Sequence, residues 1–428
     1  MRRKDAHRKP VVLRGLRGPE ATGDRVRVTT VFNKLLSLQG AFVRRVEFTP
    51  GAIVVGVRKR ARLHACPYCS FRCRARYDRG QREWRHVSLG KWRVVIRAVL
   101  CRLVCPEHGV VTEVVPWAEH DSRFTRDFED LVAWLTREMN KTAVKTLMRI
   151  AWATVGNIIE RVVARKLDPD RLRRLYVIGI DEVSYRKGHK YLTVVADHTT
   201  GNPVWIGEGR SQATVGAFFN ELGDEGSKQL KAISMDMCAS YILEARARAP
   251  QAEIAFDPFH VVKLANEAVH DVRRTEARER KGSAEAAVLK GSRWALLKAP
   301  DNLRDEERVR LSAVAGLNAR VYRAYLLKEE LRALYRCGPK PAGEHLRSWL
   351  AWASRSHLAP FVKLGRTLRE HREGILAAIR LRLSNGRMEG LNNKIGVLKH
   401  RAYGFHSFAA LAAMVFLCCT DLQLDLPI

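Results

Sequence analysis

The chain has 428 residues, of which 76 are Lys or Arg and 45 are Asp or Glu, so its formal net charge at pH 7 is +31. Hydrophobic residues make up 46% of the chain, which excludes a disordered basic tail and leaves room for about three domains with real cores. The basic residues are spread along the whole sequence, and this distribution favours double-stranded DNA over a membrane patch as the partner. The longest apolar run, residues 408–419, is shorter than the ~20 residues that span a bilayer, so we expect a buried C-terminal helix and no membrane partner.

The period of the hydrophobic pattern changes along the chain and indicates several domains. Residues 40–115 alternate as half-buried strands do, and residues 127–165 switch to the period of amphipathic helices. Short strands and helices alternate over residues 175–262, after which the pattern is almost entirely helical. The predicted segments are a flexible basic arm (1–29), a zinc-binding β module (30–120), a helix-turn-helix DNA-binding domain (121–168), the first part of an α/β core (169–264), a large all-helical insertion (265–380) and the last helices of the core (381–428).

Cysteines cluster in the N-terminal third in a pattern typical of a metal site. Two pairs of side chains, each pair separated by two residues, offer three thiolates and one imidazole, which would complete a tetrahedral zinc site with a structural role. The predicted zinc ligands are Cys66, Cys69, Cys105 and His108. The gap between the two pairs is longer than the usual ~15–20 residues, which leaves Cys73 and Cys101 as alternative ligands or as ordinary buried thiols.

Residues 140–166 contain two helical segments with a break near Ala151. This pattern predicts a helix-turn-helix whose second helix enters the major groove of DNA, although any helical hairpin shares it. Thr154 fits the N-cap of the second helix, whose predicted apolar face is formed by Val155, Ile158, Ile159 and Val162. The residues predicted to face outward are Arg149, Asn157, Arg161 and Arg165, and those expected to contact DNA are Thr154, Asn157 and Arg161.

Three carboxylates, Asp181, Asp236 and Glu389, lie in separate settings that do not favour isolated acids. The first two lie in the apolar β-like runs VIGIDEVS and AISMDMC, and the third lies near the start of an amphipathic helical stretch. A shared divalent cation would remove the cost of burying them and would supply the clamp that phosphodiester chemistry needs. Because successive strand residues point to opposite faces, we expect that only one of Asp181 and Glu182 can join a given site.

Residues 175–262 predict three antiparallel strands, a helix, a strand, a helix, a fifth strand and a helix. This order is typical of a ribonuclease-H-like fold. The expected fold class is therefore α+β and multidomain, with a zinc-binding β module, a helix-turn-helix and a ribonuclease-H-like α/β catalytic core that carries a large all-helical insertion.

Around these carboxylates the sequence resembles the DDE transposases of bacterial insertion sequences, in particular the ISL-three (ISL3) family. The phrases that carry the resemblance are GIDEVSYRKGHKYLTVVADHTTG, FDPFHVVKLANEAV and SNGRMEGLNNKIGVLKHRAYGFHSF, and the likeness runs from about Val31 to Leu422. It implies a DNA transposase that binds the terminal inverted repeats of an insertion sequence and catalyses metal-dependent strand cleavage and strand transfer. It also implies a homodimer or larger synaptic complex that acts in the bacterial cytoplasm, associated with the nucleoid. His108 departs from the pattern, because some relatives offer Cys there.

The resemblance also implies roles for individual residues. Asp181, Asp236 and Glu389 would form the catalytic triad that holds two Mg2+ (or Mn2+) ions. The supporting residues would be Asp257, His260 and Asn392, and the DNA contacts that follow Glu389 on its helix would be Lys394, Lys399 and Arg401. For the first two supporting residues a capping Asp and a satisfied core His are an alternative, and for Lys399 and Arg401 the alternative is a solvated basic face.

Two other functions fit the same pattern. A DNA-binding regulator that kept the fold but lost catalysis would be expected to lose an acidic residue first, whereas all three are present. A structure-specific nuclease on the same fold would cut DNA without joining strands. A metal-dependent cleavage assay on end-containing DNA separates these possibilities.

Overall fold

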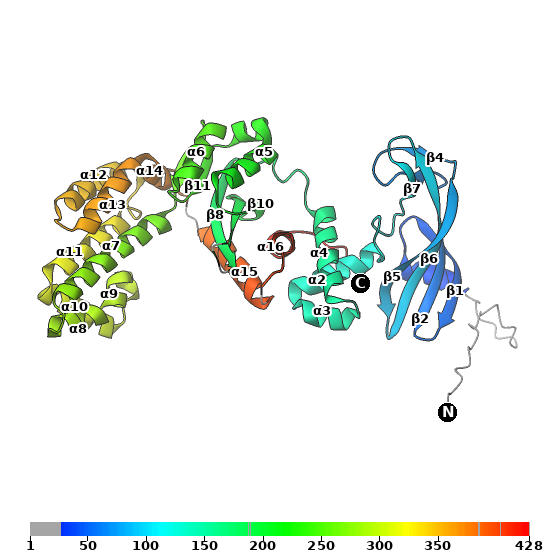
Figure 1. The fold of residues 1–428 in the computed structure, drawn as a ribbon, viewed down its shortest axis with the longest axis horizontal. Helices are drawn as coiled ribbons and strands as arrows, with labels where there is room; N and C mark the ends of the chain where they lie inside the picture. Colours follow the sequence, from blue (N-terminus) through cyan, green and yellow to red (C-terminus); the bar gives the residue numbers. More distant parts are fainter. Residues whose placement is uncertain (1–26, 187, 189, 384–385, 403, 428) are drawn as a thin grey trace, which may run out of the picture. The chain divides into compact units, whose positions relative to one another are not determined.

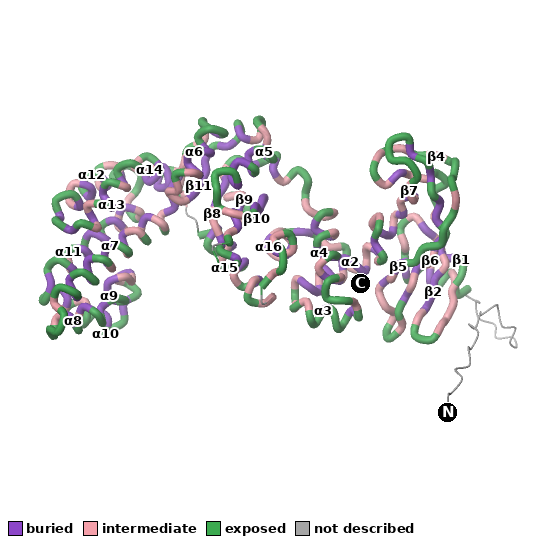
Figure 2. The backbone as a smooth tube through the Cα atoms, in the orientation of Figure 1, coloured by how far each residue is buried: buried purple, intermediate pink, exposed green. Residues whose placement is uncertain are grey.

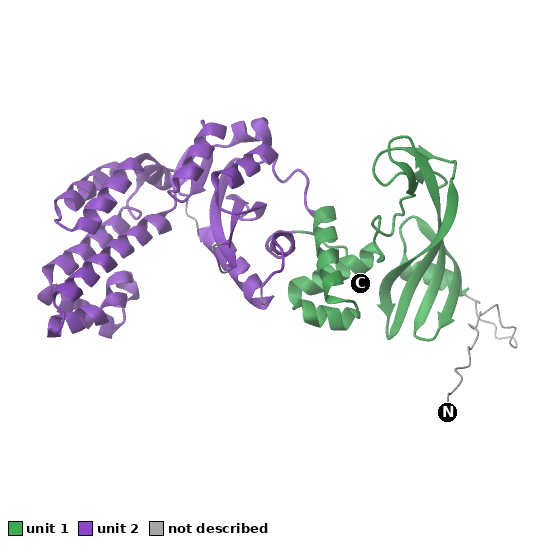
Figure 3. Cartoon of the chain, viewed as in Figure 1, with its two compact units in different colours: residues 1–166, 422–428 green, residues 167–421 purple. Residues whose placement is uncertain are grey.

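The computed structural model describes residues 27–427 apart from residues 187, 189, 384–385 and 403. The chain forms two compact units, of which unit 1 is Met1–Lys166 with Leu422–Ile428 and unit 2 is Leu167–Asp421 (Figure 3). Most of the predicted basic arm lies outside the described residues. The last residues of the chain group with unit 1, which the sequence pattern did not indicate. No described helix combines the length and the apolar character that crossing a membrane requires.

Unit 1 begins with a β module built on one long strand, β6 (Figure 1). Its elements are α1 (Val28–Leu36), β1 (Ala41–Thr49), β2 (Ala52–Lys59), β3 (His64–Ala65), β4 (Arg72–Cys73), β5 (Asp78–Leu89), β6 (Trp92–Cys105) and β7 (Gly109–Thr112). The strand order is β1-β2-β6-β5, β7 pairs with the last part of β6, and β3 pairs with β4 in a separate hairpin.

The two ends of this β module are packed very differently. Trp84, Ile96 and Trp117 contribute to a large apolar core between α1 and the sheet. At the end that carries β3, β4 and β7, the buried cluster consists of Leu103 and two cysteines. Apolar burial scales with stability, so this second end needs another source of stabilisation.

Three helices complete unit 1: α2 (Arg126–Glu138), α3 (Lys141–Met148) and α4 (Trp152–Lys166). The predicted apolar face of α4 is confirmed, because Val155, Ile158, Ile159 and Val162 are all buried. The predicted N-cap is wrong: α4 begins at Trp152, so Thr154 lies inside its first turn. The side chain that caps α3 is Asn140, which accepts a hydrogen bond from the backbone N–H of Ala143.

Unit 2 contains a mixed five-stranded sheet in the order β10-β9-β8-β11-β12. The strands are β8 (Val177–Arg186), β9 (Lys190–Asp197), β10 (Pro203–Glu208), β11 (Ala232–Met235) and β12 (Glu253–Phe256), with α5 (Gln212–Gln229) and α6 (Ala239–Arg248) between the later ones. The first three strands are antiparallel, and β11 and β12 run parallel to β8. The predicted order of strands and helices over residues 175–262 is confirmed.

The rest of unit 2 is helical. The helices are α7 (Pro258–Glu279), α8 (Ala284–Gly291), α9 (Arg293–Leu297), α10 (Asp305–Leu317), α11 (Ala319–Ala333), α12 (Pro339–Arg355), α13 (Ala359–Glu370), α14 (Arg372–Arg380), α15 (Gly386–Arg401) and α16 (Phe408–Cys419). Figure 2 shows buried positions along the facing sides of α7, α11 and α13, and Val269, Leu327 and Phe361 are wholly buried there. The expected buried C-terminal helix is α16, in which Leu411 and Val415 are wholly buried.

Lys328 of α11 is an ionisable group within this helical core. Its Nζ donates to the carbonyl oxygens of Leu296 (2.6 Å) and Lys298 (3.2 Å) and lies 2.6 Å from a carboxylate oxygen of Glu329. Burial of the side chain lowers the pKa of Lys328 from 10.5 to about 8. The unfolded chain therefore binds more protons than the folded chain between these two pH values, and the stability of the fold rises with pH across that window.

We expect this rise to reach about 3 kcal/mol for the unchanged protein. The variant Lys328→Met lacks the titrating group. The thermal unfolding midpoint of the wild type should therefore rise relative to that of the variant between pH 8 and pH 10. The measurement is the difference between the two midpoints as a function of pH. Midpoints that shift in parallel over this window would contradict the prediction.

Candidate active site and metal centre

Three aspartates stand at the same level of the unit 2 sheet, where β11 and β12 end. Gly179 of β8 pairs with Ser234 of β11. If this register is continued by two residues along both strands, Asp181 lies opposite Asp236. The register of β11 with β12, continued by one position, sets Asp236 opposite Asp257. Adjacent strands lie ~4.8 Å apart and residues in register share a face, so the sheet directs these carboxylates toward one edge.

A pocket of about 360 Å³ lies at this edge. It is lined by residues of β8, of the start of α7 and of α15, namely Asp181, Glu182, Asp257, Pro258, Phe259, His260, Gly386, Glu389 and Asn392. Five of the six residues predicted for the catalytic centre therefore border one pocket. The sixth, Asp236, is not among the lining residues, but its Oδ2 lies 3.9 Å from Nε2 of His260.

Asp181 is a partly buried carboxylate held in a fixed orientation. Its Oδ1 accepts a hydrogen bond from the backbone N–H of Glu182 (2.7 Å), and its Oδ2 accepts one from Nδ2 of Asn392 (2.6 Å). Desolvation raises the pKa of Asp181 and outweighs both hydrogen bonds. The buried Oδ1 of Asn392 has no hydrogen-bond partner among the described residues. A divalent cation would favour the ionised form of Asp181. It could also bind the Oδ1 of Asn392, either directly or through a coordinated water molecule.

Asp257 and His260 form an oriented pair beside Asp181. Asp257 is the N-cap of α7, as the structural alternative predicted, and accepts a hydrogen bond from the backbone N–H of Phe259. Its Oδ2 lies 3.0 Å from Nδ1 of His260, which leaves Nε2 directed at Asp236. The hydrogen bond to Asp257 raises the pKa of His260 despite burial of the ring. The pair thus places a proton donor between two carboxylates of the site.

Glu182 also borders the pocket, but its carboxylate has other neighbours than that of Asp181: the hydroxyl of Tyr241 lies beside it, whereas Asn392 donates to Asp181. That only one of the two acids joins a given site stays a prediction. Strand β11 ends at Met235, whereas β8 continues to Arg186. Burial raises the pKa of Glu182, and Arg210 lies 3.9 Å away. The adjacency of the two acids in the sequence was a signal for this residue, but strand alternation argued against it.

The carboxylates do not form a closed cage for a single ion. In the described part of the chain, the groups of three or more metal-ligating side chains with ligand atoms within 4.8 Å of one another both lie in unit 1. The oxygen atoms around this open pocket are of the kind that hard divalent cations bind.

The first group in unit 1 consists of the four predicted ligands Cys66, Cys69, Cys105 and His108. The Sγ atoms of Cys69 and Cys105 are 3.6 Å apart, and Nδ1 of His108 lies 3.6 Å from Sγ of Cys105 and 3.9 Å from Sγ of Cys66. Ligands ~2.0–2.3 Å from a tetrahedral ion are separated by about these distances. A hydrogen bond from the backbone of Phe71 lowers the pKa of Cys69. Desolvation and the neighbouring thiols outweigh it and raise this pKa to about 11. These side chains could hold a metal ion.

The second group contains His64, Cys101 and Glu113. Glu113 is buried and forms an ion pair with Lys59, while Nδ1 of His64 lies 2.8 Å from its Oε2. The ammonium group of Lys59 already supplies the positive charge that the carboxylate needs. Cys101 belongs to this neutralised cluster, which leaves its thiol with a packing role.

The predicted helix-turn-helix contacts divide into exposed and internal side chains. Asn157 and Arg149 are exposed, and Arg149 adopts the left-handed conformation (φ 52°) that ends α3. Arg161 and Arg165 do not face outward as predicted. Both guanidinium groups pair with the fully buried Glu129, at 2.7 Å and 3.2 Å respectively, because an unpaired buried carboxylate would be strongly destabilising.

The start of α4 carries contacts that the sequence did not single out. Trp152 is 38% exposed, and Nζ of Lys141 lies 3.8 Å from the centre of its ring. In helix-turn-helix proteins the N-terminal residues of the second helix reach the base edges. A surface indole beside a cation at this position was visible in the sequence only once the helix start was known.

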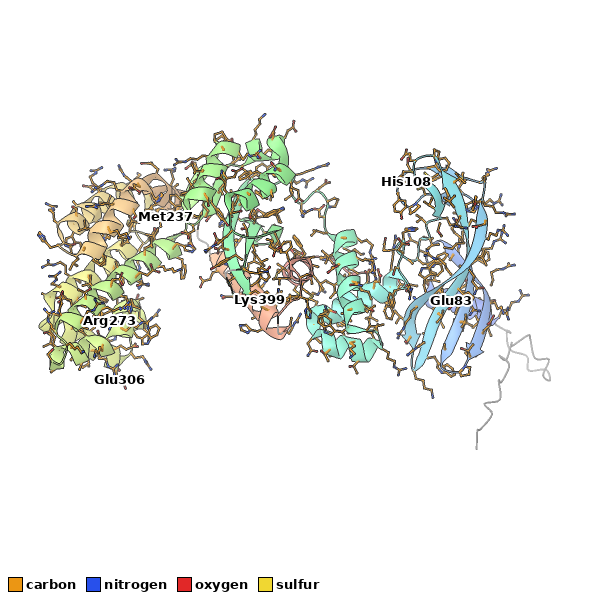
Figure 4. All side chains as sticks on the ribbon, in the orientation of Figure 1. Glu83, His108, Met237, Arg273, Glu306 and Lys399 are labelled. Carbon is orange, nitrogen blue, oxygen red and sulfur yellow. The ribbon has the colours of Figure 1, made fainter. Side chains whose placement is uncertain are left out.

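The basic residues of α15 are also divided. Lys394 is exposed, whereas Nζ of Lys399 donates to the backbone carbonyl of Ser184 (Lys399 is labelled in Figure 4). Nη2 of Arg401 lies 3.8 Å from Sγ of Cys418 in α16. Only the first of these three side chains is placed as the predicted DNA contact requires; the other two hold α15 against its neighbours.

Comparisons with known proteins match the two parts of the chain to different families of domains. A family model described as transposase matches residues 178–415, and one described as the helix-turn-helix domain of transposase family ISL3 matches residues 113–163. The transposase for insertion sequence element IS1557 of Mycobacterium tuberculosis is 40% identical over 402 residues, which cover 88% of this chain and 90% of the relative. The transposase for insertion sequence element IS1001 of Bordetella parapertussis is 34% identical over 375 residues, 86% of this chain and 92% of the relative.

Proposed function

The chain belongs to the ISL3 family of insertion-sequence transposases, and from this premise we propose that it binds the terminal inverted repeats of its element and cuts and joins DNA there by the DDE mechanism. The observation that carries the proposal is the pocket in which Asp181 meets Glu389 and Asn392, which lie more than two hundred positions later in the chain. A DNA-binding protein without catalysis has no need for such convergence.

We assign the unit 2 sheet and its flanking helices to a ribonuclease-H-like core, because three antiparallel strands are followed by two parallel strands with intervening helices. Residues 265–380 are then the helical insertion between the second and third catalytic acids. The remaining domain boundaries proposed are 30–120 for the zinc module and 121–168 for the helix-turn-helix.

Asp181, Asp236 and Glu389 are the proposed ligands of two divalent cations. When bound, the cations activate the attacking water or 3′ hydroxyl and stabilise the leaving oxygen. Asn392 fixes the orientation of Asp181 by its hydrogen bond of 2.6 Å. Asp257 orients the imidazole of His260, whose Nε2 can donate to Asp236 or to a phosphate oxygen of bound DNA.

The proposed occupant of the first group in unit 1 is structural Zn2+, held by three thiolates and one imidazole. The helix-turn-helix would supply sequence recognition through the exposed Asn157, and Lys394 would contact phosphates near the pocket. Joining two element ends requires both at once, so a homodimer or larger complex is proposed as the acting form.

The test uses the full chain with labelled duplexes that carry the element ends and with scrambled duplexes of equal length. We expect Mg2+-dependent cleavage at the end junction, followed by joining of the new 3′ hydroxyl to a target plasmid. Cleavage without joining would favour the nuclease alternative, and end binding without cleavage would favour the regulator. No preference for the ends over scrambled DNA would refute the proposal.

A further inference from the structure

An arginine-rich segment of the zinc module has no role in the function proposed above. Residues 72–79, here called the arginine loop, run from β4 to the start of β5. Its four arginines are all exposed: Arg72, Arg74, Arg76 and Arg79. Figure 2 shows the chain around β4 as largely exposed, and Figure 4 shows His108 at the same end of the module.

The positive charge of the arginine loop is not neutralised within the protein. Its one acidic residue, Asp78, forms a bidentate pair with Arg102 of β6. In the described part of the chain none of the four loop arginines has an acidic partner within 4.0 Å. Two arginines elsewhere in the same module are paired: Nε of Arg45 lies 2.5 Å from Glu47, and Nε of Arg97 lies 2.7 Å from Glu83.

The backbone that carries these arginines is held in place at both ends. At the start of the loop, β4 pairs with β3, which stands next to Cys66. Within it, Sγ of Cys73 donates to the carbonyl oxygen of Ala75 at 3.2 Å. At the far end, the backbone N–H of Tyr77 donates to the carbonyl oxygen of Arg102 at 2.7 Å. Four guanidinium groups on a fixed backbone form a preorganised anion-binding surface.

The surroundings add to this surface rather than compensate for it. Because β3 pairs with β4, the segment that precedes His64 runs beside the loop and brings the exposed Arg62 next to it. Tyr68 and Tyr77 are 58% and 60% exposed. Tyr77 lies within the loop, and arginine and tyrosine side chains are among those that contact DNA phosphate and sugar.

We propose that the arginine loop is a second DNA contact that grips the phosphate backbone, separate from the helix-turn-helix. It would add affinity without sequence preference, because phosphate contacts position a protein and base contacts specify the site. The zinc ion would then have a functional consequence, since the metal fixes the hairpin from which the loop starts. The inference rests on the proposed function only in taking double-stranded DNA as the partner.

The test compares DNA affinities of full-length proteins between 50 and 200 mM salt, on end-containing and on scrambled duplexes. The double variant Arg74→Ala/Arg76→Ala should bind both duplexes more weakly by the same factor. The slope of log affinity against log salt is negative, and each lost phosphate contact reduces its magnitude by about 0.9, so we expect the slope to become shallower by about 1.8. The rescue variant Arg74→Lys/Arg76→Lys, which keeps both charges, should restore most of the slope.

The matched control is Arg45→Ala/Arg97→Ala, which removes the same charge from the same module at paired arginines. Its slope should stay close to that of the wild type. Zinc content is measured for every variant, so that loss of the fold is not mistaken for loss of a contact. A loop variant with full zinc content and an unchanged slope would overturn the inference. Equal wild-type binding to both duplexes would refute end recognition while leaving the loop result interpretable.

Discussion

Replacing Asp181 by Asn should abolish DNA cleavage and leave the binding of end DNA unchanged. Asn keeps the size of the side chain, and its Oδ1 can still accept the hydrogen bond from the backbone N–H of Glu182. Its Nδ2 replaces the oxygen that accepts from Asn392, and it can donate to the Oδ1 of Asn392 once that amide turns over. It lacks the negative charge that a divalent cation needs, so we expect cleavage to fall by about 10³-fold or more. The measurement is single-turnover cleavage of labelled end DNA in Mg2+, with binding followed by anisotropy in Ca2+.

The stability of this variant separates a catalytic from a structural role. Burial raises the pKa of Asp181, which means that its charge is unfavourable in the folded protein without a cation. The neutral Asn should therefore leave the thermal midpoint unchanged or raise it, as is common for residues kept for activity. Asp224→Asn, at an exposed position of α5, is the control and should retain cleavage. An Asp181→Asn protein that still cuts, or one that loses both activity and stability, would contradict the assignment.

The sequence predicted the elements whose side chains follow a regular period. The apolar face of α4 is one example, because helical spacing reports burial directly, and the strand around Asp181 is another, because its short apolar run is buried. The cluster of Cys66, Cys69, Cys105 and His108 was predictable for a similar reason: a short spacing holds the two members of each pair together, and only the approach of the two pairs depends on the fold.

What the sequence did not predict depends on contacts between distant segments. Arg161 has the right position on α4 to face DNA, but its guanidinium group forms an ion pair with the buried Glu129 of α2. The ammonium group of Lys399 likewise donates a hydrogen bond to a backbone carbonyl of β8. Glu182 borders the same pocket as Asp181, which no local pattern of β8 could indicate. Charge placement is therefore less predictable than burial, because any nearby acid or carbonyl can redirect a long side chain.

Cys66→Ser should remove the metal from unit 1 and disorder one end of its β module. That end buries little more than Leu103 and the cysteines themselves, whereas structural zinc contributes about 10–16 kcal/mol in small zinc domains. The sheet around Trp84 has its own apolar core and should stay folded. We expect wild-type protein to bind one zinc per chain and the variant to bind none, with fast amide exchange and new tryptic cleavage in residues 64–76.

The control for this prediction is Cys73→Ser. Cys73 lies near the cluster but outside its four ligands, and a serine hydroxyl can donate to Ala75 as the thiol does. This variant should keep its zinc and its protection against trypsin, which also excludes Cys73 as an alternative ligand. Because the arginine loop begins at the same hairpin, loss of zinc in Cys66→Ser should make the salt slope of DNA binding shallower as the loop substitutions do. If zinc and exchange protection survive in Cys66→Ser, the end of the module is stabilised by its packing alone, and the metal has no part in presenting the arginines.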